Sequence, residues 1–121
     1  MIEGTLGLTA FEFITRYLER GGLLPGFVDG YTKIHHDEHR HIGYGIWYLQ
    51  AAVADDPALG EQIRETLREL LPAVAASLAP PDRGNDTDWE ALGASADEIR
   101  TFALTGLNRR LKIIVVDLGS A

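Results

Sequence analysis

A regular stripe of side chains at helical spacing runs through residues 27–48 of the chain. Its members recur at alternating steps of four and three residues: Phe27, Tyr31, Ile34, Glu38, His41, Gly45 and Tyr48. This spacing places side chains on one face of a helix. At about 1.5 Å per residue, a helix over residues 26–54 is roughly 40 Å long. The sequence therefore predicts one long helix whose main face carries a carboxylate and an imidazole among apolar groups.

A second stripe precedes this helix and predicts another helix beside it. The expected inward positions are Glu3, Gly7, Ala10, Ile14 and Tyr17, and Leu6, Phe11, Phe13 and Leu18 widen the stripe. The tandem Gly21–Gly22 is a normal helix stop, because glycine tolerates left-handed dihedral angles. The connector over residues 21–26 is short, which suits two antiparallel neighbouring helices. We therefore expect a long antiparallel helix pair.

The rest of the chain predicts further helices. A third helix runs through Leu59 to Leu71, where we expect Pro72 to kink or end it. Residues 79–88 read as a polar loop, and Trp89 and Leu92 as a short helical turn. Ser95 followed by Glu98 fits a capping box that opens a last helix. Its expected inward positions are Ile99, Phe102, Ala103, Gly106, Leu107, Leu111 and Ile114.

The C-terminal residues 111–118 are rich in Ile and Val and have strand propensity. Helix is favoured there, because nothing else in the sequence offers a strand partner. The chain has 121 residues, which suits a single domain. The expected class is therefore all-α, as one helical domain over residues 1–121.

Composition excludes several classes of function. Eleven Lys and Arg against 18 Asp and Glu give a net charge of -7, which disfavours binding to nucleic acid. There is no cysteine, hence no disulfide framework and no thiolate metal site. No apolar run approaches the ~18 residues that a membrane span needs. The N-terminal residues lack a secretory pattern, so the expected location is cytoplasmic.

Glu38 and His41 are the first two candidate metal ligands in the sequence. They lie three residues apart, so a helix brings both side chains to one face, where a carboxylate oxygen and a ring nitrogen can reach a common ion. Such groups are costly on an apolar face unless they are paired or bind a metal. A chance pair on an exposed helix is the alternative, and the position of this pair within the stripe favours metal ligands.

Glu3 is a second carboxylate in an apolar stripe and the third candidate ligand. Counted from the connector, Glu3 lies roughly 27 Å along its helix and Glu38 roughly 18 Å, which leaves their proximity open. A frayed helix end that keeps Glu3 hydrated is the alternative. Asp37 is expected to accept a hydrogen bond from a ligating histidine of a facing helix. The remaining histidines are expected to be exposed or to support ligands: His35, His36 and His39.

Four motifs together resemble the C-terminal half of a ferritin-like family. They are Glu3-Gly4, Gly22-x-Leu24-Pro25-Gly26, Asp37-Glu38-His39-Arg40-His41-Ile42 with Gly45, and Asn108-Arg109-Arg110-Leu111. The family comprises the ligand-binding oxidases related to the ribonucleotide reductase small subunit. The resemblance covers about the first 55 residues well and the later helices more loosely.

The resemblance implies half of a ferritin-like helical bundle with a dinuclear centre that activates dioxygen. The metals would be two irons, or manganese with iron, and a long-chain fatty acid would bridge them. By it, the ligands of the second half-site are Glu3, Glu38 and His41. The helices that supply the other three ligands have no counterpart in these 121 residues. The docking tail of reductase small subunits also lacks a counterpart, which speaks against a reductase subunit.

Three interpretations remain open at the level of sequence. Two copies associate by two-fold symmetry and form a six-ligand site between them. Alternatively, the chain is a truncated product that needs a complementary N-terminal-half chain. In the third interpretation the chain is a diverged helical interaction module, in which Glu38 and His41 pair with each other or with solvent.

Overall fold

The computed structural model describes residues 3–79, 93–114 and 116. The elements are a π-helical turn η1 (Glu3–Gly7) and the α-helices α1 (Leu8–Arg20), α2 (Pro25–Asp55), α3 (Ala58–Leu78) and α5 (Ala96–Ile114). No strand occurs in these ranges, so the all-α prediction is confirmed for the described part of the chain. The predicted loop beyond Ala79 and the turn at Trp89 and Leu92 lie outside the described residues.

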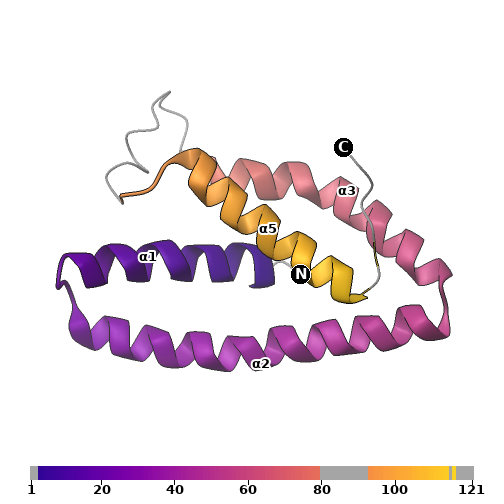
Figure 1. Ribbon diagram of the computed structural model, residues 1–121, viewed down its shortest axis with the longest axis horizontal. Coiled ribbons are helices and arrows are strands. Elements are labelled where there is room, and N and C mark those ends of the chain that lie inside the picture. The colour runs from indigo at the N-terminus through magenta and orange to yellow at the C-terminus, as the bar shows by residue number, and fades with distance from the viewer. Residues whose placement is uncertain (1–2, 80–92, 115, 117–121) are drawn as a thin grey trace.

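The helices are arranged around α5, which contacts η1, α1, α2 and α3. In Figure 1, α1 and α2 run side by side in opposite directions, and α2 extends well past the N-terminal end of α1. Helix α3 runs back from the C-terminal end of α2, and α5 lies between α2 and α3. The predicted long antiparallel pair is therefore present.

The connector between α1 and α2 follows the expected turn chemistry. Gly22 has a φ of 61°, which is the left-handed region that glycine adopts without strain. The amide of Leu23 donates to the carbonyl of Leu18 at 2.8 Å and so closes the end of α1. Pro25 begins α2, where its missing N–H costs nothing. The short connector and its effect on helix direction are thus confirmed.

The core lies along one face of α5. Its buried side chains are Ile99, Ala103, Leu107, Arg110, Leu111 and Ile114. The amide of Glu98 donates to Ser95 Oγ at 3.1 Å, which confirms the predicted helix start. Helix continues through Ile114, so the strand alternative is wrong over residues 111–114. Phe102, expected to face inward, is 39% exposed and meets Phe13 edge-on.

Helix α3 continues past Pro72, which lies inside it. The side chain of Asp56 accepts a hydrogen bond from the amide of Ala58 at 3.0 Å, as expected for an acidic residue before the helix. Proline removes one backbone donor but does not force a break when the surrounding residues remain helical. An end of the helix at Pro72 is therefore wrong, and helix continues to Leu78; a kink at Pro72 stays a prediction.

The inward stripe predicted for the first helix is wrong at its central positions. All five of these are exposed: Glu3, Gly7, Ala10, Ile14 and Tyr17. The residues predicted beside them are covered, since Phe13 is buried and Leu6, Phe11 and Leu18 are half-buried. The buried face of η1 and α1 is instead formed by Gly4, Thr5, Thr9, Phe13 and Thr15. This face packs toward α5, as the edge-on contact of Phe13 and Phe102 at 5.6 Å shows. Polar threonines therefore occupy the covered side, and an apolar stripe is left in solvent.

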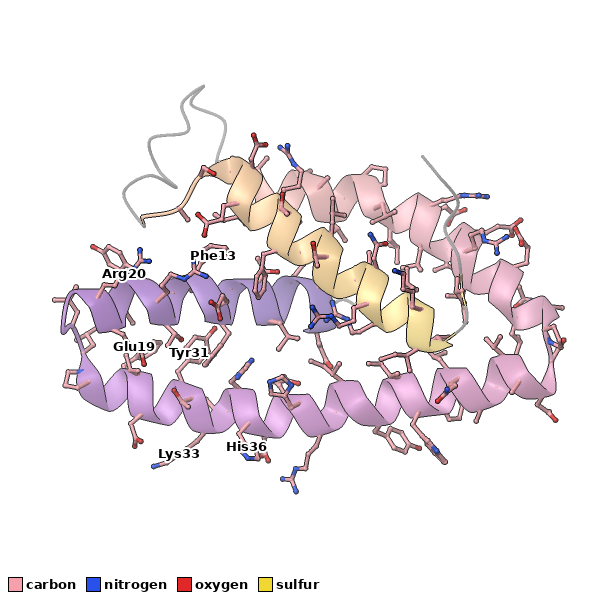
Figure 2. All side chains as sticks on the ribbon, viewed as in Figure 1. Phe13, Glu19, Arg20, Tyr31, Lys33 and His36 are labelled. Atoms are coloured by element: carbon pink, nitrogen blue, oxygen red, sulfur yellow. The ribbon has the colours of Figure 1, made fainter. Side chains whose placement is uncertain are left out.

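Helix α2 has a half-buried inner face and no fully buried residue. Its inner face contains Val28, Tyr31, His35, Glu38, Ile42, Ile46, Leu49 and Val53. In Figure 2, Tyr31 points toward α1, whereas Lys33 and His36 point away from it. Much of the predicted stripe therefore lies outside the intramolecular contact. None of the helices in the described ranges is long and apolar enough to span a membrane.

Candidate metal site

Glu38 and His41 meet on α2 as the sequence predicts. His41 Nδ1 lies 3.3 Å from Glu38 Oε2, one helical turn away. The Glu38 side chain is 38% exposed and the His41 side chain 69% exposed. The pair therefore stands at the border between the inner face of α2 and its solvent-exposed face, and the expectation of a buried position is wrong.

The Glu38 carboxylate has one oxygen in an unusual environment. Oε2 is shielded from solvent, yet it accepts no hydrogen bond from any described residue. Its contact with His41 Nδ1 is close enough for an ion pair if the imidazole is protonated, but it lacks hydrogen-bond geometry. A shielded carboxylate oxygen without a donor is costly, and a bound cation would remove that cost. The donor set of one carboxylate and one imidazole fits iron or manganese.

Glu3 occupies the first position of the π-helical turn η1 and is exposed. Single π-helical turns are rare and are often found at functional sites. Within residues 3–79, 93–114 and 116, no three carboxylate or imidazole side chains are grouped closely enough to hold a metal ion. The structure therefore brings Glu38 and His41 together, but it does not join Glu3 to them as one three-ligand site.

Asp37 and the other histidines lie around the candidate pair. Asp37 forms an ion pair with Arg40 on the exposed side of α2, and this contact lowers the pKa of the Asp37 carboxyl. His36 and His39 are exposed, as expected for residues off the predicted stripe. His35 is half-buried between α2 and α1, which the sequence did not indicate. A hydrogen bond from a ligating histidine to the Asp37 carboxylate stays a prediction.

A set of large apolar side chains on α2 is exposed. They are Phe27, Ile34, Tyr44, Trp47 and Tyr48, and each is more than half exposed. Positions 34, 41 and 48 are spaced by seven residues, so they follow one side of the helix past His41. Tyr44 lies beside Trp47 and Tyr48, with ring centroids 5.8 and 6.5 Å apart, and exposed apolar clusters of this kind are typical of interaction sites. We call these five residues the apolar face of α2.

Arg110 is the residue that sequence reasoning missed. The prediction used the Asn108-to-Leu111 motif only as a resemblance, whereas the structure buries the Arg110 side chain against Gly4. The available signal was its position, because Arg110 follows Leu107 by three residues and so continues the inward stripe of the last helix. Arg110, like Glu38, is a charged side chain within an apolar stripe, and such a side chain needs a partner of opposite charge.

Comparison with known proteins leaves this site without a template. No protein-family model matches the chain, and no solved structure matches its fold. The relationship to ferritin-like oxidases therefore stays a prediction from the four motifs.

Proposed function

We propose that this chain supplies one half of a di-metal carboxylate centre of the oxidase type related to the ribonucleotide reductase small subunit. The observation that carries the proposal is the shielded Glu38 Oε2, which has no hydrogen-bond donor among the described residues and lies 3.3 Å from His41 Nδ1. Glu38 and His41 would hold a metal ion, and Glu3 is the third candidate ligand. When bound, iron, alone or with manganese, supplies the redox chemistry that activates dioxygen.

A second copy of the chain is the partner that this proposal requires. One Glu38–His41 pair gives an ion too few ligands, and a two-fold axis beside α2 would bring a second pair opposite the first. The apolar face of α2 supports this arrangement, because Ile34 and Tyr48 flank His41 and are 60% and 57% exposed. Closing the dimer would remove this apolar surface from water and shield the metal ligands together.

Metal-dependent stabilisation tests the proposal on the metal-free protein. Adding ferrous iron or manganese under anaerobic conditions should raise Tm, because a ligand that binds only the folded protein stabilises it. Glu38→Ala and His41→Ala should remove this rise. His39→Ala is the matched control and should retain it, because His39 is exposed and off the ligand pair. A wild-type Tm that neither metal changes contradicts the proposal.

A metal-independent helical interaction module is the second candidate function. The apolar face of α2 favours it, because five large exposed side chains on one helix suit a protein partner whether or not a metal is present. In that case Glu38 and His41 pair with each other at 3.3 Å. The two candidates differ in one measurable property. An oligomer that persists unchanged in excess chelator supports the module, and dissociation supports the metal centre.

A further inference from the structure

The guanidinium group of Arg110 is held in place at the contact of α5 with η1. The residue is only 9% exposed. A Cβ added at Gly4 would lie 3.0 Å from Arg110 Nε, and one at Gly106 would lie 3.3 Å from Nη1, so both glycines give the side chain its room. Arg110 Nη2 donates to Thr5 Oγ1 at 3.3 Å. The side chain is therefore oriented by its surroundings.

The charge of Arg110 is not compensated within the described part of the chain. No carboxylate there forms an ion pair with it, and Nε has no acceptor. Burial and the neighbouring charge of Arg109 both lower the pKa of Arg110, burial being the larger cause. A buried charge is costly unless it is paired. An anion bound here would therefore form an ion pair with a guanidinium group that is already in position.

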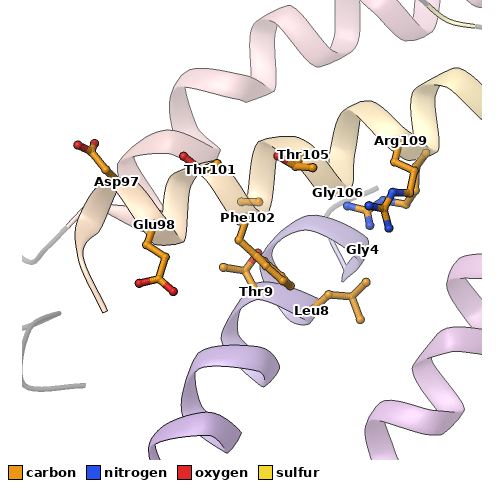
Figure 3. A pocket seen from close by; sticks show the side chains of 12 residues that line it. Gly4, Leu8, Thr9, Asp97, Glu98, Thr101, Phe102, Thr105, Gly106 and Arg109 are labelled. Carbon is orange, nitrogen blue, oxygen red and sulfur yellow. The ribbon is translucent and has the colours of Figure 1, made fainter. Parts of the chain in front are cut away.

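A cavity of about 610 Å³ lies beside this charge, between α5 and the start of the chain. Leu8 and Phe102 give it apolar walls. Figure 3 shows Arg109 at one end of the cavity and Asp97 and Glu98 at the other. The cavity is therefore basic at one end and acidic at the other, so an anion is favoured only next to the arginines.

We propose that this cavity binds a small organic carboxylate, with its anionic group at Arg109 and Arg110 and its apolar body against Leu8 and Phe102. A guanidinium matches the planar geometry of a carboxylate and donates charge-assisted hydrogen bonds to it. The acidic end limits the ligand to one anionic group. The site is independent of Glu38 and His41, so it holds or fails separately from the proposed metal centre.

Calorimetric titration with three probes tests the proposal on the metal-free chain. Benzoate should bind at least about tenfold more tightly than benzamide, which has the same shape without the charge. Inorganic phosphate should bind more weakly than benzoate, because it gains nothing from the apolar walls. Equal affinity for benzoate and benzamide, or phosphate affinity as high as that of benzoate, contradicts the proposal.

Two arginine variants locate the binding on these residues. Arg109→Gln and Arg110→Gln should each weaken benzoate binding by at least about tenfold. Lys112→Gln is the matched control, because it removes one positive charge from an exposed position on the same helix and should change the affinity less than about twofold. Arg109 is exposed, so its variant keeps the test valid if loss of the buried Arg110 impairs folding. Unchanged benzoate affinity in Arg109→Gln, or a loss in Lys112→Gln as large as that in Arg109→Gln, overturns the assignment.

Discussion

The imidazole of His35 stacks on the ring of Phe11. The two ring centroids lie 3.6 Å apart and the ring planes differ by 5°. His35 thus joins α2 to α1, and its other ring neighbour is His39, whose centroid lies 4.4 Å away. A histidine on the inner face of the helix pair makes the packing of that pair sensitive to protonation.

Acidification should weaken the fold through His35. Burial is the main cause that lowers the His35 pKa below its ordinary value of 6.5, the charges of His39 and His36 add to it, and Glu12 opposes it. The unfolded chain therefore takes up the proton at a higher pH than the folded chain does. Stability is complete above about pH 7 and falls as the pH drops through 6.5, until the folded form is also protonated.

Thermal melts of the wild type and of His35→Gln between pH 7.5 and pH 5.5 check this expectation. The variant should lose less Tm than the wild type over this range. His36→Gln removes an exposed histidine on the same helix, whose charge is the smallest of the causes that act on the His35 pKa, so its pH profile should stay close to that of the wild type. Parallel pH profiles for the wild type and His35→Gln would show that the stacked ring is not the sensitive group.

Truncation of the α5 core should be strongly destabilising. Leu107 is 2% exposed in the cluster that also contains Leu67 and Leu111. Leu107→Ala should reduce the free energy of unfolding by about 2–5 kcal/mol, because it removes buried methyl groups and leaves a cavity. Leu104→Ala changes the same residue type at a 42% exposed position of the same helix and should cost under about 1 kcal/mol. Urea unfolding of both variants gives the comparison, and equal costs would refute this packing.

The cap of α5 should be worth a measurable part of the stability. Ser95 Oγ accepts the hydrogen bond from the amide of Glu98, so Ser95→Ala should cost about 1 kcal/mol. The Ser77 hydroxyl donates a hydrogen bond to the carbonyl of Ala73 inside α3 and does not cap a free backbone N–H group. Ser77→Ala should therefore change stability by less than about 0.5 kcal/mol. Urea unfolding measures both, and a cost at Ser77 as large as that at Ser95 would contradict the capping role.

Two glycines in η1 should respond oppositely to alanine. A Cβ at Gly4 would lie 3.0 Å from Nε of the confined Arg110 side chain, so Gly4→Ala should lower Tm. Gly7 has no atom within 4 Å of the same added carbon, and its φ of −63° is helical. Gly7→Ala should therefore stabilise the fold by about 0.5–1 kcal/mol. Differential scanning fluorimetry of both variants is sufficient, and a rise in Tm for Gly4→Ala would show that Arg110 is not confined.

Helix positions were predictable from the sequence, because they depend on local chemistry. The Gly21–Gly22 stop and the Ser95 cap each act within a few residues. The faces of the helices were less predictable, because a face is chosen by what the rest of the chain places against it. In α1, Phe13 reaches α5 with threonines beside it, and the more regular apolar stripe through Ile14 and Tyr17 stays exposed.

The candidate site likewise has one part that the sequence predicts and another that depends on how the chain packs. The contact of Glu38 with His41 follows from their spacing of three residues on one helix. The position of Glu3 depends on how η1 and α2 pack, which periodicity does not determine. Arg110 was missed because its surroundings come from Gly4, more than a hundred residues away in sequence.

Metal content per chain, measured together with the mass of the native assembly, distinguishes a di-metal centre shared by two chains from a metal-free helical module. Protein purified from cells supplied with iron and manganese should be a dimer that carries about two metal ions. Glu38→Ala and His41→Ala should remove the metals, whereas His39→Ala should keep them. A wild-type protein that is free of metal after this supply, at any oligomeric state, would contradict the account.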